Sequence, residues 1–347
     1  MGSTLKVGMI GAGGIAGTHI GYLKKIPGVE VVAVCDVREE AAKNTATKFE
    51  IPHIFSSYKD VIQLKEVDAV SVCTPNYFHA EPTIAALKAG KHVMVEKPMA
   101  MNAKEAKAMV DAAKKAKKIL VIGFQFRYHP HAQVIKRAID DGRIGKVLYC
   151  RCQALRRRGI PSWGVFGQKK LQGGGPMIDI GVHILEVADY LMGTPEAVAA
   201  SGNCYTYIGN RKPDTMCSWG PWDYKTYTVE DLAVGLIRFA NGSTLVIEAS
   251  FAAHLEKDVF SFTLMGERGG ATFEPPQLFT DMSGTMFNLA APVVPKSDMF
   301  ELKMRDWVES IRTGKKPIAP GEHGLIVQKM LDGIYRSAEV GREVPIR

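Results

Sequence analysis

Groups that could move a proton stand at two places in the chain. At the first, Glu96 and Lys97 follow a short apolar run, and Pro98 ends that run. Proline fixes its own φ and keeps the preceding residue extended. We expect Lys97 to project from a strand end into the cleft above the sheet, where neighbours that lower its pKa would make it a proton-transfer group. A surface lysine that merely ends a strand is the alternative.

The second place is the stretch GGGPMIDIGVH, residues 173–183. Asp179 opens a segment with helical spacing, and His183 lies four residues later, so the two side chains share one face over the first turn. A carboxylate beside an imidazole raises its proton affinity and fixes its tautomer, which suits a general acid/base. A helix-capping aspartate with a partly buried histidine is the alternative. No third or fourth ligand stands at metal spacing, so we expect no metal.

A glycine-rich turn near the start predicts a dinucleotide site. The pattern Gly11-x-Gly13-x-x-Ala16 follows a buried-strand run and precedes helical spacing, which is the context that this fingerprint requires. Gly11 would make the tight turn, Gly13 would let the backbone approach a pyrophosphate, and Ala16 would let helix and strand pack closely. The N-terminus of the helix would offer N–H groups to the anion.

Asp36 ends the next strand, 20 residues beyond Ala16. A carboxylate there can accept both ribose hydroxyls of NAD and would repel the 2′-phosphate of NADP. Arg38 could cover the adenine or tolerate a phosphate, so NADP is the less favoured cofactor. A helix N-cap is the structural alternative for Asp36. The expected cofactor contacts in this region are Gly11, Gly13, Gly14, Ile15, Ala16, Asp36, Val37 and Arg38.

The elements that position these groups change character at residue 123. Before it, apolar runs alternate with helical segments, which predicts an α/β, Rossmann-type parallel sheet with ligands at the carboxyl ends of its strands. After it, alternating strands and an Asn241-Gly242 hairpin turn predict an α+β domain with a large, mostly antiparallel, open-faced sheet. We therefore expect an NAD-binding domain over 1–123 and a domain for substrate binding and oligomerisation over 124–347.

Composition narrows the class of protein. With 46% hydrophobic and 23% charged residues, the chain is an ordinary globular one, without an apolar run long enough for a membrane span or a signal peptide, so we expect a cytoplasmic protein. Six cysteines without a C-x-x-C pair predict buried free thiols. The net charge is +8, but no nucleic-acid-binding motif accompanies the basic runs. We expect a homo-oligomer, dimer or tetramer, formed through the open face of the sheet.

Taken in order, the motifs are similar to those of the glucose–fructose oxidoreductase/inositol dehydrogenase/MocA (Gfo/Idh/MocA) family. The resemblance covers nearly the whole chain and includes Thr74-Pro-Asn-x-x-His79, Glu96-Lys97-Pro98 and residues 173–183. It implies an NAD(P)-dependent dehydrogenase that oxidises a secondary hydroxyl of a sugar, glycoside or inositol-type polyol to a ketone, or the reverse. The family's catalytic positions are matched by Lys97, Asp179 and His183. There the histidine is generally the acid/base, while the lysine and the aspartate position and polarise the hydroxyl.

The resemblance also implies further contacts. Positions around the nicotinamide end of the cofactor are matched by Thr74, Asn76, His79, Glu96 and Lys97. Segments that approach the substrate would contribute Lys97, Arg127, Arg156, Trp163, Asp179 and His183. Two other functions stay open. One is an NAD-dependent glycosidase that oxidises C3 transiently and eliminates the aglycone, and the other is a non-catalytic NAD-sensing regulator.

Overall fold

A computed structural model describes residues 4–347, which form two compact units. The first unit contains the chain up to Gln125 together with Asp298–Leu325, and the second contains Phe126–Ser297 and Ile326–Arg347. The first junction lies close to the expected boundary at residue 123. Residues 298–325, which a single boundary would assign to the second domain, pack instead with the first unit.

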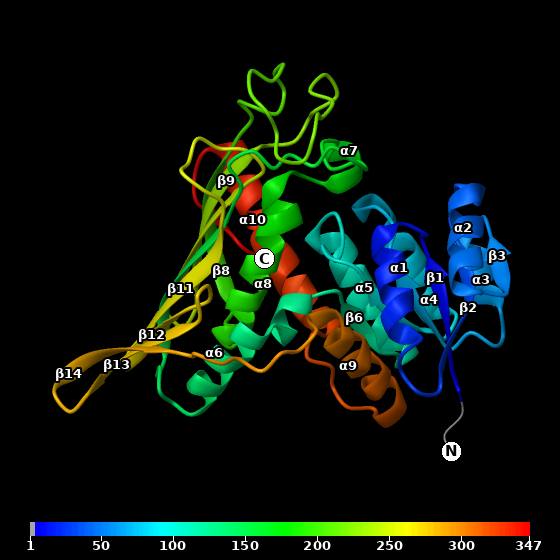
Figure 1. Ribbon diagram of the computed structural model, residues 1–347, viewed down its shortest axis with the longest axis horizontal. Helices are drawn as coiled ribbons and strands as arrows, with labels where there is room; N and C mark the ends of the chain where they lie inside the picture. The colour runs from blue at the N-terminus through cyan, green and yellow to red at the C-terminus, as the bar shows by residue number, and fades with distance from the viewer. Residues whose placement is uncertain (1–3) are drawn as a thin grey trace. The chain divides into compact units, whose positions relative to one another are not determined.

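The first unit is organised around a six-stranded parallel sheet with the strand order β3-β2-β1-β4-β5-β6 (Figure 1). Its strands are β1 Leu5–Ile10, β2 Val29–Cys35, β3 His53–Phe55, β4 Ala69–Val72, β5 His92–Val95 and β6 Leu120–Ile122. Its helices are α1 Gly14–Leu23, α2 Glu39–Phe49, α3 Tyr58–Gln63, the 3₁₀ turn η1 Asn76–Phe78, α4 Ala80–Lys88, α5 Ala103–Ala116 and α9 Met299–Thr313. Because all neighbouring strands are parallel, the segments that follow them meet at one edge of the sheet.

Helix α9 completes this unit by packing against α1. The rings of Tyr22 and Phe300 stack with centroids 6.3 Å apart. The helix also has an apolar face, on which Met304 and Trp307 are fully buried. Burial of that face explains why a segment that follows the second unit in sequence belongs to the first.

The second unit contains a nine-stranded sheet with the order β14-β13-β12-β11-β7-β10-β9-β8-β15. Its strands are β7 Val147–Leu155, β8 Ala197–Tyr205, β9 Leu232–Phe239, β10 Thr244–Ser250, β11 Val259–Gly266, β12 Gly269–Thr272, β13 Gln277–Met282, β14 Thr285–Ala290 and β15 Val344–Pro345. Its helices are α6 Pro130–Asp140, α7 Lys169–Gln172, the π-helical turn η3 Met177–Gly181, α8 Val182–Leu191 and most of α10 Gly321–Val340; the 3₁₀ turn η2 Gln125–Tyr128 leads into it. Strands β7 and β10 pair in parallel and the other pairs are antiparallel, which confirms the expected fold class.

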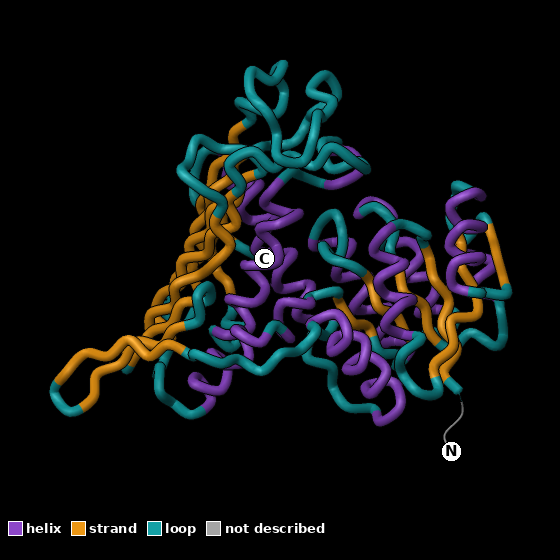
Figure 2. The backbone as a smooth tube through the Cα atoms, in the orientation of Figure 1, coloured by secondary structure: helices purple, strands orange, loops and turns teal. Residues whose placement is uncertain are grey.

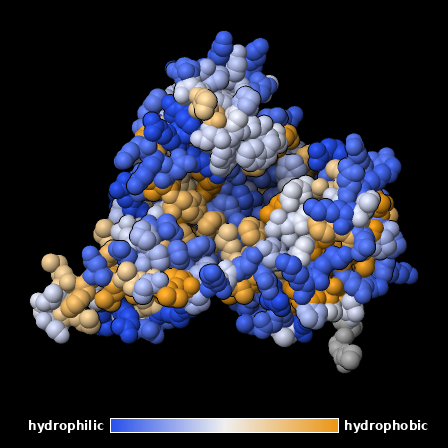
Figure 3. All heavy atoms as spheres, viewed as in Figure 1, coloured by the Kyte–Doolittle hydropathy of each residue, from blue (hydrophilic) through white to orange (hydrophobic). Residues whose placement is uncertain are grey.

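Helices of this unit lie on one face of its sheet (Figure 2). Helix α8 packs on β7 and β11, and Ile334 of α10 packs against Gly235 of β9, where a Cβ would come within 2.7 Å of its side chain. At the far end of the sheet, the β13–β14 hairpin carries exposed apolar side chains (Figure 3). Met286 is 86% exposed and Phe287 37% exposed. Monomeric proteins seldom expose apolar side chains in such clusters.

Two further findings concern the described residues. Within residues 4–347, none of the helices combines the length and the apolar character that crossing a membrane requires. All six cysteines are free, and Cys35, Cys73, Cys150 and Cys152 are buried.

Candidate active site

The glycine turn after β1 leaves an open N-terminus on α1. Gly11 has φ +95°, and a Cβ there would come within 2.6 Å of the Cys73 carbonyl oxygen. Added Cβ atoms at Gly13 and Gly14 would meet no heavy atom within 4 Å, and no side chain caps the helix. Ala16 is fully buried at the close approach of helix and strand. The turn therefore has the open backbone surface that a pyrophosphate needs.

Asp36 lies at the end of β2, beside this turn. Its Oδ2 accepts a hydrogen bond from the Ala12 N–H at 3.0 Å, and its Oδ1 accepts one from the Arg38 N–H at 2.9 Å. The N-cap position of α2 is Arg38, so Asp36 is not the helix cap that we considered as its alternative role. Its carboxylate is half-buried and fixed by backbone donors, while Val37 is 91% exposed.

His79 joins the turn after β4 to the turn after β5. Its Nδ1 lies 2.8 Å from the carbonyl oxygen of Pro98, and its Nε2 lies 2.9 Å from that of Thr74. The ring is buried, and burial lowers the pKa of His79, so the neutral ring has one proton to share between these two carbonyls. Its side chain therefore holds the two turns in place; a contribution to cofactor binding would act through those turns.

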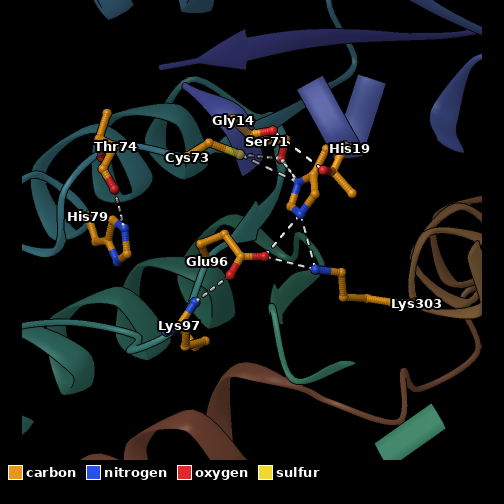
Figure 4. Close-up of polar contacts among 10 residues, drawn as sticks. Gly14, His19, Ser71, Cys73, Thr74, His79, Glu96, Lys97 and Lys303 are labelled. Atoms are coloured by element: carbon orange, nitrogen blue, oxygen red, sulfur yellow. Dashed lines mark hydrogen bonds and ion pairs between the residues drawn. The ribbon is translucent and has the colours of Figure 1, made fainter. Parts of the chain in front are cut away.

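A buried ion-pair network lies next to Lys97 and includes its neighbour Glu96 (Figure 4). The Lys303 Nζ lies 2.8 Å from the Glu96 Oε1 and donates to it, and the His19 Nε2 lies 2.9 Å from the same oxygen. The Nδ1 of His19 is 2.8 Å from the Ser71 hydroxyl. Figure 4 shows the side chains of His19, Glu96 and Lys303 pointing toward one another, from α1, the end of β5 and α9. His19 and Lys303 are fully buried.

The charges in this network follow from its geometry. Burial alone would raise the pKa of Glu96, but the Lys303 ammonium and the hydrogen bond from His19 hold that pKa well below its usual range. Burial and the charge of Lys303 lower the pKa of His19 to about 4. The network is therefore a carboxylate, an ammonium and a neutral imidazole, whose Nε2 faces both the Glu96 carboxylate and the Lys303 ammonium, the latter at 3.0 Å, and whose Nδ1 faces the Ser71 hydroxyl.

The same carboxylate contacts the backbone of Lys97. The Glu96 Oε2 accepts a hydrogen bond from the Lys97 N–H at 3.2 Å. On the other side, Gly123 makes room for the carboxylate, because a Cβ there would come within 2.5 Å of the Glu96 Oε1. Lys97 itself is half-buried, in contrast to the enclosed Glu96. The buried Glu96 carboxylate therefore fixes the position of the Lys97 backbone.

In the second unit, Asp179 and His183 lie on consecutive turns where the π-helical turn η3 runs into α8. Both side chains are half-buried. The Asp179 N–H donates to the Gly175 carbonyl at 3.0 Å, and the ring of His183 packs edge-on against Phe126 with centroids 5.2 Å apart. A π-helical turn at this point is an irregularity that often accompanies a functional site.

The glycines before Asp179 are required by close packing. A Cβ on Gly174 would come within 2.1 Å of the Tyr335 hydroxyl, and one on Gly175 would come equally close to the Glu230 carbonyl oxygen, at 2.1 Å. Below them, Glu230 accepts hydrogen bonds from the Tyr335 hydroxyl at 2.8 Å and the Met177 N–H at 3.3 Å. These contacts fix the loop that leads to Asp179.

Two arginines that we expected near the substrate have different environments. Arg127 is fully buried, donates from Nε to Glu186 at 2.7 Å and lies over the ring of Tyr190, so its charge is used inside the fold and the expected substrate contact needs correction. Arg156 is half-buried and lies over Trp219, with its guanidinium carbon 3.9 Å from the ring centroid. Trp163 is 55% exposed and stacks on Trp219.

Sequence reasoning missed His19 and Lys303. His19 lies in the helical segment after the glycine turn, where its spacing shows no partner, and Lys303 lies within the residues expected to form the second domain. A usable signal was present for Lys303, because its neighbours Met304 and Trp307 are apolar residues on a helix that must bury one face.

The comparisons with known proteins agree with this geometry. Residues 5–124 match the sequence model of an oxidoreductase family with an NAD-binding Rossmann fold, and residues 132–272 match that of the GFO/IDH/MocA C-terminal domain. The chain belongs to the Gfo/Idh/MocA family. Residues 5–124 are therefore the family's NAD-binding domain, and the chain is a member of a family of sugar and polyol oxidoreductases, as the sequence motifs implied.

Several members of the family are similar over most of the chain. A D-glucoside 3-dehydrogenase from Escherichia coli (strain K12) is 36% identical over 99% of this chain and 98% of its own length. A myo-inositol 2-dehydrogenase from Thermotoga maritima is 27% identical over 99% and 98%, respectively. Among solved structures, a levoglucosan dehydrogenase in complex with NADH is 25% identical, with 99% of each chain covered and a TM-score of 0.86.

Proposed function

We propose that the protein is an NAD-dependent dehydrogenase that oxidises one secondary hydroxyl of a glycoside to a ketone, or catalyses the reverse reduction. The first candidate for the reacting position is C3 of a D-glucoside. The observation that carries this proposal is the 36% identity to a D-glucoside 3-dehydrogenase over 99% of the chain. The other similar enzymes, by name, act on levoglucosan and myo-inositol, which are also rings with several secondary hydroxyls.

The first unit has the groups that NAD requires. The open backbone at Gly13 and Gly14 would receive the pyrophosphate, and the carboxylate of Asp36, fixed by the Ala12 and Arg38 N–H groups, would accept the ribose hydroxyls. Bound NAD would supply the acceptor for the electron pair of the carbinol C–H bond, at C4 of its nicotinamide ring.

The chain's own residues would handle the proton and the charge. The imidazole of His183 takes the proton from the substrate hydroxyl as the C–O bond becomes a carbonyl, and returns it in the reverse direction. The Asp179 carboxylate orients this imidazole and stabilises its protonated form. The Lys97 ammonium, held by the bond from its backbone N–H to Glu96, donates to the same substrate oxygen and stabilises its developing negative charge.

The proposal is tested by incubating the protein with NAD⁺ and separate glycosides, free sugars and inositols while the absorbance of reduced nicotinamide is followed. We expect reduced cofactor in equal amount to a keto product, identified by NMR. Release of the aglycone without net reduced cofactor would instead assign the transient-oxidation glycosidase. NAD binding without conversion of any compound would favour the non-catalytic regulator.

We also propose that the protein is a homo-oligomer. The support is the face of the nine-stranded sheet on which Figure 2 shows no helix among residues 4–347, together with the exposed apolar hairpin β13–β14. Two copies that pair through such surfaces would shield side chains such as Met286 and Phe287 from water.

A further inference from the structure

Two tryptophans from distant parts of the sequence stack on each other at the surface of the second unit. The ring centroids of Trp163 and Trp219 are 5.3 Å apart and their planes differ by 30°. Trp163 is 55% exposed and Trp219 is 37% exposed. Trp222, in the same loop as Trp219, anchors that loop: its ring is buried, and its Nε1 donates to the Gly209 carbonyl at 2.6 Å. The exposed pair does not have this anchoring role.

Hydrogen bonds between the two loops hold the pair in a fixed position. The Ser218 N–H donates to the Arg158 carbonyl oxygen at 2.8 Å, and the Ser162 hydroxyl donates to the Trp219 carbonyl oxygen at 2.5 Å. Both tryptophans are therefore pre-positioned, and a ligand that stacks on them would not have to order the loops first. Preorganisation of this kind increases affinity because it lowers the entropy lost on binding.

The pair is linked to the proposed catalytic carboxylate through Arg156. The guanidinium carbon of Arg156 is 3.9 Å from the ring centroid of Trp219, and its Nη1 donates to the Gly159 carbonyl at 3.2 Å. Burial lowers the pKa of Arg156, and the Asp179 carboxylate is close enough to oppose that effect. A series of groups thus runs from Asp179 through Arg156 and Trp219 to the exposed ring of Trp163.

We infer that Trp163, Trp219 and Arg156 form a second carbohydrate subsite, which takes the sugar ring attached to the one that is oxidised. This inference rests on the proposed function and narrows its substrate class from any glycoside to a disaccharide or a larger saccharide. A pyranose has a flat face of C–H groups that packs on an indole, and hydroxyls around its edge that a guanidinium can bind. The exposed face of Trp163 and the charged edge of Arg156 match these two features.

The inference is tested by comparing substrates with one and two rings. The ratio of kcat/KM for maltose or cellobiose to kcat/KM for the corresponding methyl glucoside is measured with NAD⁺ for the wild type, W163A, W163F and W222F. We expect the wild type to favour a disaccharide, W163A to lower that ratio roughly three- to tenfold, and W163F to retain part of it. W222F, which changes a buried anchor in the same loop, should keep the wild-type ratio.

A second measurement separates this inference from the proposed reaction. Tryptophan fluorescence of the full-length protein is titrated with the same disaccharides without cofactor, so that no turnover is needed. A change in the wild type that W163A loses supports the subsite, even if no reduced cofactor forms and the proposed reaction fails. If the protein oxidises glucosides but W163A leaves the ratio of kcat/KM for the disaccharide to kcat/KM for the methyl glucoside unchanged, the subsite alone is overturned. No fluorescence change and no turnover would overturn both.

Discussion

The ammonium of Lys303 lies 2.8 Å from the carboxylate of Glu96, although the two residues are 207 positions apart in the sequence. Both side chains are buried, and the other carboxylate oxygen of Glu96 accepts the N–H of Lys97. The residue proposed to polarise the substrate is thus held by a charge pair whose cationic partner lies on a helix from the far end of the chain.

Replacing Lys303 by methionine should destabilise the protein strongly, because it leaves the Glu96 carboxylate buried without its cation. We expect a loss of about 3–5 kcal/mol in the free energy of unfolding. The double variant E96Q/K303M should recover part of this loss, since it removes the unpaired charge. Urea denaturation measures the free energy of unfolding of both variants. The control is Lys315→Met, which replaces an exposed lysine just after α9. A K303M variant as stable as K315M would show that the pair contributes nothing.

Replacing His183, the proposed acid/base, or Lys97, the proposed donor to the substrate oxygen, should slow the reaction without removing the cofactor. Lys97→Ala and His183→Ala are each expected to lower kcat by roughly 10²–10⁴-fold. Steady-state kinetics measure this change, and NADH fluorescence titration checks that binding persists. Near-full turnover in both variants with intact cofactor binding would refute the catalytic assignment.

Replacing Asp36 by serine should change the cofactor preference. The carboxylate would no longer accept the ribose hydroxyls or repel a 2′-phosphate, so NAD should bind more weakly and NADP relatively better. Binding constants for NAD and NADP, measured in parallel for the wild type and D36S, give the ratio of the two affinities in each protein. If neither constant changes, Asp36 does not select the cofactor.

Stability should fall as the pH rises toward neutrality because of a buried acidic pair in the second unit. Burial raises the pKa of Glu186 and of Asp189 to about 7, against the opposing charge of Arg127. Between the ordinary carboxyl pKa and about 7, the folded protein binds more protons than the unfolded chain, so the stability that these groups contribute at acidic pH is lost as the pH rises through 7.

The variant Asp189→Asn isolates this effect. Neither carboxylate oxygen of Asp189 has a hydrogen-bond partner within residues 4–347, so the amide removes a buried charge without breaking such a bond. We expect its gain in the free energy of unfolding to be roughly 1–3 kcal/mol larger at pH 8 than at pH 5. Asp214→Asn, on an exposed loop, is the control. Equal effects at both pH values would argue against a raised pKa.

A charge on the β13–β14 hairpin should weaken self-association. Met286→Asp places a carboxylate on a side chain that is 86% exposed in one chain and proposed to lie at the contact between copies. Analytical ultracentrifugation of the wild type should show a dimer or tetramer, and that of M286D a shift toward the monomer. A wild-type protein that sediments as a monomer would contradict the proposed homo-oligomer.

The sequence predicted most elements because their signals are local. The apolar run and the glycines at residues 5–16 give strand, turn and helix in one stretch, and Asn241-Gly242 marks the turn between β9 and β10. The residues that were misjudged or missed depend on distant partners. Arg127 was expected to approach the substrate, but it pairs with Glu186, and Lys303 was not singled out because it reaches Glu96 only through the packing of α9 against α1. No local spacing encodes such pairs.

The return of α9 to the nucleotide-binding unit also affects how the protein is made. A ribosome releases residues 4–125 long before residues 298–325, yet both belong to one compact unit. During that interval, the nascent chain would carry Glu96 and His19 without Lys303, with the apolar surface under α9 still open to water. The first unit therefore reaches its final form only after residues 298–325 have been made, and the second unit, which needs residues 326–347, is completed later still.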